Sequence, residues 1–342
     1  CRVYGVESYR CTFAHITAEY SANIAVAGSY FHHAFDYGGG GRAYGVVLQF
    51  ATGECRIENN IFERLRHSML LQAGANGNVF AFNYSTDPYW TGVNPLIPSD
   101  AAGDIVLHGN WPYANLFEHN ICQNIVIDNS HGPNGPFNTF FRNRAEAYGI
   151  FFSADNSPSC NIVGNEITNT SLPYSLVNYS IRGEDHFLYG NNDKGRVRPD
   201  SNVTLSDTSY AYRQRPAFLH SFSGTGIGIP DDIGTGSIPA RDRYENDDIF
   251  ASICLDGAIA AIPQLPVQSS VTVYPNPARG HIYLRTEGDN RCNPYVIVDL
   301  NGRRVAEGYI GGPESFIDTA ALPRGSYFLL LPELGMHRFV IE

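Results

Sequence analysis

Short apolar runs closed by an asparagine recur through the first half of the chain. The asparagines that close five consecutive runs are Asn60, Asn83, Asn120, Asn143 and Asn165. Their intervals are 23, 37, 23 and 22 residues, so the second interval holds one period plus an insertion of 14 residues. Self-similarity at a fixed period of this size is typical of a solenoid, in which each repeat stacks on its neighbour.

A second column of apolar runs keeps the same period. Its runs end in a polar residue, at Gln49, Gln72, His108, Asp128, Ser153 and Asn178. The repeat is too short for two helices and a turn, and its runs are rich in β-branched and aromatic residues, which favours strands. We therefore predict an all-β domain over residues 1–250, in which each repeat forms one turn of a parallel β-helix.

The asparagine column has a structural explanation. Asn tolerates the left-handed backbone that a sharp bend needs, and stacked Asn side chains can hydrogen-bond from one turn to the next. Asp36 stands 24 residues before Asn60 and is predicted to open this column. Arg142 and Arg144 flank one member of the column, Asn143, and are expected on a solvated face.

The pattern changes in the last third of the chain. Residues 210–244 are rich in Gly, Pro and Asp and are expected to form a long closing loop, and residues 251–268 are predicted to be a linker. Short alternating strands follow over residues 269–342, with a hairpin turn at Asn301-Gly302. This part is predicted to form a small antiparallel, immunoglobulin-like β-sandwich.

Composition supports this organisation and excludes some functions. The 342 residues are 43% hydrophobic and only 17% charged, which suits a large, turn-rich β core. The net charge of −11 disfavours unspecific binding to nucleic acid. No run approaches 18 consecutive apolar residues, so we expect no transmembrane segment.

The seven cysteines show no metal-type spacing. Cys55 and Cys122 are expected to be buried as small hydrophobic residues. Two pairs are candidate disulfides, Cys1–Cys11 and Cys254–Cys292. Three early histidines stand apart from other ligand residues, and no metal ligand is assigned. They are His15, His32 and His33.

The C-terminal residues 269–342 contain four short segments in a characteristic order. They are Tyr274-Pro-Asn-Pro277, Val296–Arg303, Leu322–Leu329 and Phe339–Glu342. In these segments the chain closely resembles the C-terminal sorting domain of type IX secretion substrates. The resemblance implies export across the outer membrane by the type IX machinery, followed by release or by attachment at the cell surface.

Residues 1–250 resemble the pectin-lyase-like family of right-handed parallel β-helices, in their rung pattern and Asn corners. The resemblance implies that fold and, for the enzymes of the family, action on polysaccharide in a groove along one sheet. Hydrolases of the family pair carboxylates, and lyases use a base with a cation, often calcium. This chain lacks the paired aspartates with Gly-His-Gly of polygalacturonases and the Arg-x-Pro-x-x-Arg of pectate lyases. No catalytic residue is therefore carried over, and calcium is expected only for a lyase.

Candidate chemistry lies in the second polar column. His108 and Asp128 occupy equivalent places on neighbouring turns, where Asp128 is expected to orient His108 as a base. Asp104 stands four residues before His108, and His131 follows Asp128 on a Gly/Pro-rich turn; both join the predicted catalytic group. The alternative is an inward polar ladder, in which the members of the column, from Gln49 onward, hydrogen-bond to each other.

Aromatic and basic residues near this column are candidates for substrate binding. Tyr89 and Trp90 lie on the insertion, and Trp111 lies on the next turn. The rings on the insertion either stack on a sugar or pack into a cluster of the loop itself. Arg66 and His67 precede the matching strand one turn earlier.

Two functions stay open at this stage. The first is a secreted or outer-membrane-surface protein that acts on or binds extracellular polysaccharide, as a lyase or glycoside hydrolase if it is an enzyme. The second is a non-catalytic adhesin that uses the solenoid as a stalk. The missing family motifs favour the second function. The aromatic insertion and the neighbouring His108 and Asp128 favour the first.

Overall fold

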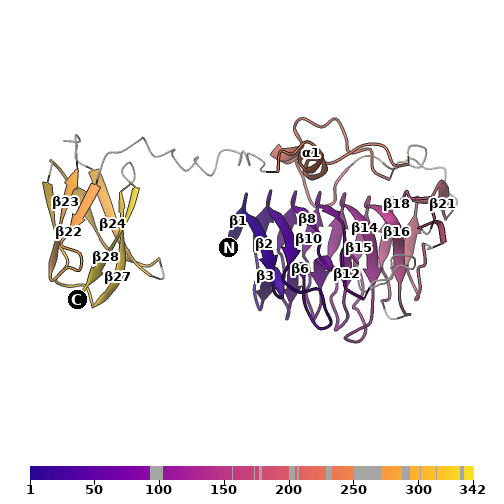
Figure 1. Ribbon diagram of the computed structural model, residues 1–342, viewed down its shortest axis with the longest axis horizontal. Helices are drawn as coiled ribbons and strands as arrows, with labels where there is room; N and C mark the ends of the chain where they lie inside the picture. Colours follow the sequence, from indigo (N-terminus) through magenta and orange to yellow (C-terminus); the bar gives the residue numbers. More distant parts are fainter. Residues whose placement is uncertain are drawn as a thin grey trace. The chain divides into compact units, whose positions relative to one another are not determined.

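The structure, a computed structural model, divides into two compact units, Cys1–Cys254 and Leu255–Glu342. It describes residues 1–342 except 93–102, 156, 173, 177–178, 200–204, 206–207, 229–232, 250–270, 287–292, 301, 313 and 332–334. The predicted linker therefore lies outside the described residues. Figure 1 shows the first unit as short strands stacked turn on turn. Among the described residues, no helix is long and apolar enough to cross a membrane.

The first face of the solenoid is a sheet of parallel strands, each three residues long. In order they are β1 (Arg2–Tyr4), β4 (Ala25–Ala27), β7 (Arg56–Glu58), β10 (Val79–Ala81), β13 (Leu116–Glu118), β15 (Thr139–Phe141), β17 (Asn161–Val163) and β19 (Phe187–Tyr189). Their register places Phe80, Phe117 and Phe140 side by side on successive turns. The sequence repeat is therefore also the structural repeat.

The other two faces share one sheet, because β14 (Ile121–Ile127) and β16 (Arg144–Phe152) run across the bend between them. The second face holds β2 (Glu7–Cys11), β5 (Tyr30–Ala34), β8 (Ile61–Glu63), β11 (Tyr84–Thr86), β18 (Glu166–Ile167), β20 (Asn191–Asp193) and the antiparallel β21 (Arg196–Arg198). The third face holds β3 (Ala14–Glu19), β6 (Tyr44–Gln49), β9 (His67–Leu71) and β12 (Ile105–Leu107). The chain visits the three faces in turn, which confirms the predicted solenoid of parallel strands.

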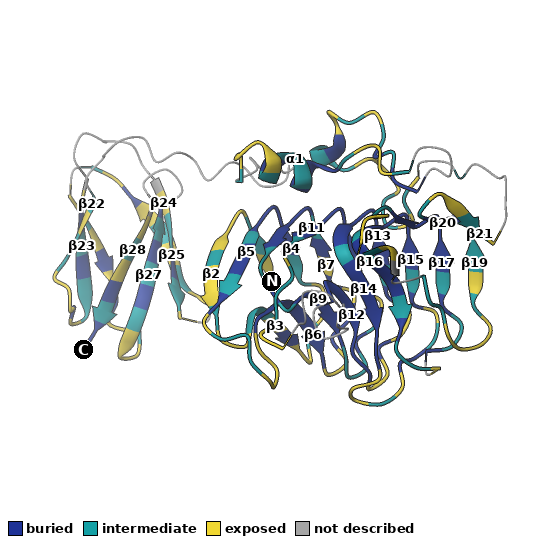
Figure 2. Cartoon of the chain, turned by 45° about the vertical axis from the view of Figure 1, so that its right-hand side comes forward, coloured by how far each residue is buried: buried dark blue, intermediate teal, exposed yellow. Residues whose placement is uncertain are grey.

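The core runs as a column through the middle of the turns. The rings of Phe80, Phe117 and Phe140 are fully buried and stack with centroids 5.2 Å apart at each step. Figure 2 shows this interior as a continuous band of buried residues through the first unit. Burial of each such ring stabilises the fold by about 1.5–3 kcal/mol. Cys55 and Cys122 belong to the same core, as predicted.

The asparagine column is a hydrogen-bonded ladder inside one corner. Asn120 Nδ2 donates to the carbonyl of Phe80 and to Oδ1 of Asn143, each at 2.9 Å. Its own Oδ1 accepts from the backbone N–H and Nδ2 of Asn83. The left-handed residue at each corner is the one before the Asn, for example His119 with φ 51°. The predicted hydrogen bonds between stacked Asn side chains are confirmed, whereas the predicted left-handed backbone of the Asn itself was wrong, because the residue before it makes the bend.

The closing segment, by which we mean the described residues between 205 and 249, packs over the corner between the first and second faces. This segment carries η3 (Ala217–Leu219) and α1 (Pro239–Glu245), whereas η2 (Tyr174–Leu176) precedes it. Figure 1 shows α1 above the strand ends. Leu219, Ile227 and Ile238 form one apolar cluster with Ile61 and Phe82 of the solenoid. The predicted closing loop thus contains a helix and seals a corner.

Two arginines anchor the closing segment. Arg142 donates to the carbonyl oxygens of Ile227 and Leu205 at 2.5 and 2.6 Å. Arg144 pairs with Glu166 at 2.5 Å and donates to the carbonyl of Gly236. Both arginine side chains are buried. The expectation of a solvated face was wrong, because the acceptors of these guanidinium groups lie on a segment much later in the chain.

The second unit consists of two antiparallel sheets. One holds β22 (Val271–Tyr274), β23 (His281–Thr286) and β26 (Glu314–Asp318). The other holds β25 (Arg304–Ile310), β24 (Asn293–Asp299), β27 (Gly325–Leu331) and β28 (Gly335–Ile341). Ile282 and Leu284 of the first sheet meet Ile297, Leu329 and Phe339 of the second in one core. The predicted antiparallel sheets are confirmed.

The candidate disulfides are not supported. Cys1 and Cys11 are both free thiols, so the first predicted pair is wrong. Cys11 Sγ, at the end of β2, lies 3.6 Å from the carbonyl oxygen of Tyr44 on the third face. Cys254 and Cys292 lie outside the described residues.

Candidate functional site

The described part of the polar column points away from the core; its last predicted member, Asn178, lies outside the described residues. Val46 and Leu48 belong to the interior, whereas Val47 clusters with Val106 and Val126 on the outer side of the sheet. Since alternate residues of a strand share a side, the polar residue two positions after each outer valine also points outward. The alternative of an inward ladder is therefore wrong in direction.

The column contains hydrogen bonds of two kinds. In the early turns, Gln72 donates to Gln49, and Gln49 donates to Glu19 at 2.6 Å. In the later turns, His108 Nδ1 lies 2.7 Å from Asp128 Oδ2, as predicted for neighbouring turns. The first kind is an amide ladder that holds the turns together. The second joins an ionisable base to a carboxylate.

Asp128 is held as an anion that orients His108. Burial raises the pKa of Asp128, but the hydrogen bond and charge of His108 and the hydrogen bonds from Ser130 outweigh it, so the net pKa is lowered. The backbone N–H of Ser130 donates to Asp128 Oδ1 at 2.9 Å. With Nδ1–H directed at Asp128, the lone pair of a neutral His108 sits on Nε2. His108 and Asp128 are 7% and 5% exposed.

His108 lies between two other imidazoles. Its ring centroid is 5.7 Å from that of His67 and 4.7 Å from that of the exposed His131. His67 Nδ1 donates to the carbonyl of Gly103 at 2.8 Å, and its Nε2 has no hydrogen-bond partner within the described part of the chain. Burial lowers the pKa of His67 to about 3, so this ring is neutral at physiological pH. We call His67, His108, His131 and Asp128 the histidine cluster.

The predicted basic and aromatic residues divide between two places. The guanidinium of Arg66 lies 5.2 Å from the ring of Trp90 and 6.0 Å from that of Tyr44, which in turn contacts His67. Arg66 and Trp90 therefore adjoin the histidine cluster. Tyr89 instead packs against Tyr37 and beneath Arg64, neither of which belongs to the insertion.

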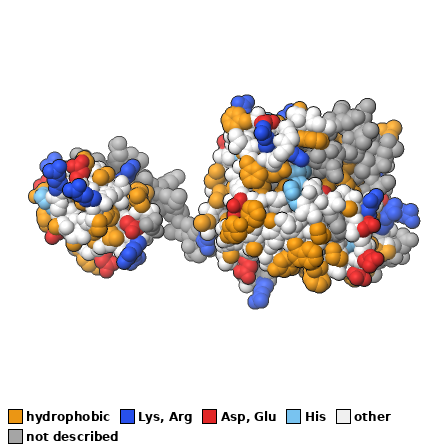
Figure 3. Space-filling view, turned by 90° about the horizontal axis from the view of Figure 1, so that it is seen from below, with side chains coloured by type: hydrophobic (Ala, Val, Ile, Leu, Met, Phe, Trp, Pro, Cys, Tyr) orange, Lys and Arg blue, Asp and Glu red, His pale blue; other side chains and the backbone are white. Residues whose placement is uncertain are grey.

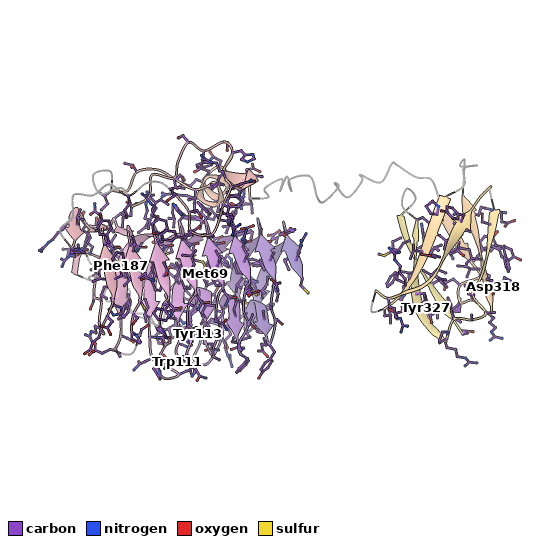
Figure 4. The ribbon with its side chains drawn as sticks, turned by 180° about the vertical axis from the view of Figure 1, so that it is seen from behind. Met69, Trp111, Tyr113, Phe187, Asp318 and Tyr327 are labelled. Atoms are coloured by element: carbon purple, nitrogen blue, oxygen red, sulfur yellow. The ribbon has the colours of Figure 1, made fainter. Side chains whose placement is uncertain are left out.

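Trp111 and Tyr113 project from the loops that follow the third face. Figure 4 shows both at the lower margin of the solenoid, and they are 51% and 37% exposed. Figure 3 looks onto this margin and shows hydrophobic side chains gathered beside a histidine. The loops stack closely, since a Cβ at Gly109 would lie 2.5 Å from the carbonyl oxygen of Gly132. Gly109, with φ +81°, is therefore required beside His108.

Asp104 does not join the histidine cluster. It lies at the opposite end of β12 from His108 and is fully buried. Its carboxylate accepts from Ser85 Oγ at 2.5 Å and from the N–H groups of Gln123 and Asn124 at 2.9 and 2.8 Å. Burial raises its pKa to about 6, although these donors oppose the shift. These contacts hold a bend of the backbone together, so the predicted place of Asp104 in the catalytic group was wrong.

The sequence of the second unit decides what it is. Residues 272–337 match the family model described as secretion system C-terminal sorting domain. The second unit is a type IX secretion sorting domain. The sorting domain makes this a secreted or cell-surface protein that interacts with the type IX secretion machinery. No curated protein and no solved structure matches the chain, and the family match leaves the solenoid uncovered.

One group of possible metal ligands on the second face was not predicted from the sequence. His32, His33 and Glu63 offer ligand atoms that all lie within 4.8 Å of one another. The reason is an error in the predicted alignment, which placed Asp36 at the start of the asparagine column. The structure places Ser29 there, and the backbone N–H of Ser29 donates to Asn60 Oδ1. With the correct 31-residue interval, His32 and Glu63 fall on neighbouring strands and are register partners.

Proposed function

We propose that the solenoid of this exported protein binds an extracellular polysaccharide at the histidine cluster and cleaves it, with His108 as the base. The observation that carries the proposal is the 2.7 Å contact between His108 Nδ1 and Asp128 Oδ2. A carboxylate in that position fixes the imidazole tautomer and stabilises the imidazolium that forms when Nε2 takes a proton.

The contacts of the histidine cluster favour elimination over hydrolysis. Hydrolysis of a glycoside needs two carboxylates that share the work of acid and base. Among the described residues, the rings of this cluster contact one carboxylate, Asp128, which already serves His108. In an elimination, His108 Nε2 removes the proton beside a sugar carboxyl group, and the exposed His131 protonates the departing glycosidic oxygen. The guanidinium of Arg66, next to Trp90, supplies positive charge for the sugar carboxylate.

Calcium does not fit this cluster. Calcium takes six to eight oxygen ligands, whereas the cluster offers imidazole nitrogens and the carboxylate of Asp128. The calcium that the family resemblance implies for a lyase therefore has no role in the proposed elimination.

A second candidate function is binding without cleavage. His108 is almost fully buried, whereas Trp111 and Tyr113 expose much of their rings on the adjoining loops. Exposed aromatic rings stack on sugar faces, and this needs no base. A glycan-binding surface of this kind suits the alternative of a surface adhesin.

The two functions separate in one set of measurements on the full chain. Wild-type protein and His108→Ala are incubated with a panel of acidic and neutral polysaccharides, and unsaturated products are followed by ultraviolet absorbance. We expect a 10²- to 10⁴-fold lower kcat for His108→Ala with little change in KM. Gln72→Ala, in the same column but in the amide ladder, is the matched control and should keep full activity.

Binding is tested separately with Trp111→Ala. Affinity electrophoresis on the same polysaccharides should show weaker retention of Trp111→Ala and unchanged retention of His108→Ala. Retention of wild-type protein without any product would overturn the catalytic part and leave the binder. Neither retention nor product with any polysaccharide would overturn both functions.

A further inference from the structure

A group of imidazole and carboxylate side chains stands on the second face, on a different sheet surface from the histidine cluster. His32 and Glu63 are register partners on the adjacent parallel strands β5 and β8. His33 follows His32 and has a left-handed backbone with φ 59°, as the residues of this corner do. Because of this corner, consecutive histidines turn their rings to the same place, and their Nδ1 atoms lie 3.1 Å apart.

The contact between His32 and Glu7 decides which nitrogen of His32 carries a lone pair. Nε2 of His32 lies 3.1 Å from Oε1 of Glu7, which can only accept a hydrogen bond. Nε2–H therefore donates, and the lone pair of a neutral His32 sits on Nδ1, directed at His33. In metal sites, a histidine that binds the ion through one ring nitrogen usually donates the N–H of the other nitrogen to a carboxylate. This hydrogen bond fixes the tautomer and makes the histidine a stronger ligand.

The spacing of the ligand atoms suits a small tetrahedral ion. Zinc binds imidazole nitrogen at about 2.0–2.1 Å, so two such ligands of a tetrahedral ion stand about 3.3 Å apart. The two Nδ1 atoms already have nearly this separation, at 3.1 Å. Without an ion, one of them must carry a proton for a hydrogen bond between them. The carboxylate of Glu63, within 4.8 Å of both, completes the set after a small side-chain rotation.

The surrounding tyrosines hold the ligands in place. The hydroxyl of Tyr30 donates to Glu63, and its ring stacks on His32 with centroids 4.0 Å apart and an interplanar angle of 6°. Tyr244, from α1 of the closing segment, also hydrogen-bonds Glu63. Tyr9 covers the outer side of both histidine rings. A rigid set of this kind loses little freedom when it binds an ion.

The local charges favour a divalent cation. Glu7 and Glu63 bring two negative charges to two imidazoles. Of the arginines nearby, Arg64 is paired with Asp87 at 2.7 Å, and Arg10 lies over the ring of Tyr9. Both point their charge at other partners.

The geometry points to a binding site for a divalent transition-metal ion of the zinc class, formed by His32 Nδ1, His33 Nδ1 and the Glu63 carboxylate. Two imidazoles and one carboxylate leave a fourth position open to water, since His33 and Glu63 are only partly buried. The bound ion links two turns of the solenoid and, through Tyr244, ties in the closing segment.

The test uses tag-free, full-length protein stripped with a chelator. Zinc binding is measured by calorimetry, and bound zinc is counted by elemental analysis after dialysis. We expect one tight zinc ion per chain in the wild type and at least 100-fold weaker binding for His33→Ala and Glu63→Gln. Glu7→Gln keeps all three ligands and should weaken binding about 10-fold. Circular dichroism confirms that each variant is folded.

Two controls separate this site from other zinc-binding side chains of the chain. His131→Ala removes an exposed histidine of the other cluster, and Cys11→Ser removes the thiol nearest His33 in the fold. Both should bind zinc as the wild type does. Cobalt should give the visible bands of a tetrahedral ion in the wild type and lose them in His33→Ala. Equal zinc affinity in the wild type and His33→Ala, or less than one zinc per chain, would overturn the site.

Discussion

The solenoid and the sorting domain bury very different side chains. The solenoid buries the asparagine ladder, Arg142, Arg144, Asp104 and Glu166, whereas Thr319 is the buried polar residue among the described part of the sorting domain. The difference follows from topology. Each solenoid corner is covered by the next turn, so its backbone polar groups need partners inside the protein. The turns of a sandwich stay at the surface, where water serves them.

This comparison teaches where each unit is vulnerable. In the solenoid, a substitution does most harm when it leaves a buried polar group without its partner. In the sorting domain, it does most harm when it opens a cavity between two apolar sheets. Variants that remove one kind of contact or the other can test the distinction, and both tryptophans of the chain lie in the solenoid and report on that unit alone.

The largest effect is expected for Arg144→Leu. It leaves Glu166 as a buried charge without its partner at 2.5 Å and frees the carbonyl of Gly236. We expect a loss of about 3–5 kcal/mol in the free energy of unfolding of the solenoid. Urea unfolding followed by tryptophan fluorescence measures it. The matched control is Arg279→Leu in the sorting domain, whose pair with Glu342 is exposed and contributes about 0–1 kcal/mol. A loss below 1 kcal/mol for Arg144→Leu would contradict the argument.

A cavity in the sorting domain should act on that unit alone. Leu329 is fully buried between the two sheets, next to Ile297 and Phe339. Leu329→Ala should cost the sorting domain about 2–5 kcal/mol, measured by hydrogen exchange of its strands. Tryptophan fluorescence should show no change in the unfolding of the solenoid. A parallel shift of both transitions would mean that the two units unfold together, against the division proposed from the sequence.

The sequence predicts contacts that repeat and misses those that do not. Asn120 and Asn143 could be paired because the successive turns from Asn60 to Asn165 carry the same residue at the same place. The burial of Arg142 could not be predicted, because its acceptors, Leu205 and Ile227, lie on an irregular segment with no period. The direction of the His108 side chain could not be predicted for a related reason. Three consecutive apolar residues precede it, so no alternation of apolar and polar residues shows which side of the strand faces the core.

Asn120→Ala tests the ladder itself. It removes the donor to the carbonyl of Phe80 and the acceptor for both nitrogens of Asn83. Water reaches a corner cavity only in part, so we expect a loss of about 2–3 kcal/mol in solenoid stability. Asn169→Ala, in a surface turn where the exposed side chain accepts a hydrogen bond from Ser171 N–H, should cost less than about 0.5 kcal/mol. Equal losses of stability in the two variants would show that the asparagine ladder does not stabilise the solenoid.

The last prediction concerns the pH dependence of solenoid stability, whose expected change within any one pH unit is smaller than the losses above. Burial raises the pKa of Asp104 from 3.8 to about 6, so the folded state holds this proton more tightly than the unfolded chain does. The contribution of Asp104 is therefore lost as pH rises from about 4 to about 6, by at most about 1.4 kcal/mol per pH unit. His67 changes stability in the opposite direction. Burial lowers the pKa of His67 to about 3, so its contribution to the stability of the solenoid is lost as pH falls below 6.5.

Because these two slopes oppose each other, the informative quantity is the difference between wild type and Asp104→Asn. Asn at this position cannot ionise, so the stability of the variant relative to wild type should rise as pH increases from 4 to 6 and level off above 6. The matched control is Asp318→Asn, a surface carboxylate of the sorting domain, which should leave the pH dependence of the tryptophan signal unchanged. A flat difference for Asp104→Asn would mean that the donors from Ser85, Gln123 and Asn124 keep the buried carboxylate fully ionised, so that hydrogen bonding outweighs desolvation at this bend.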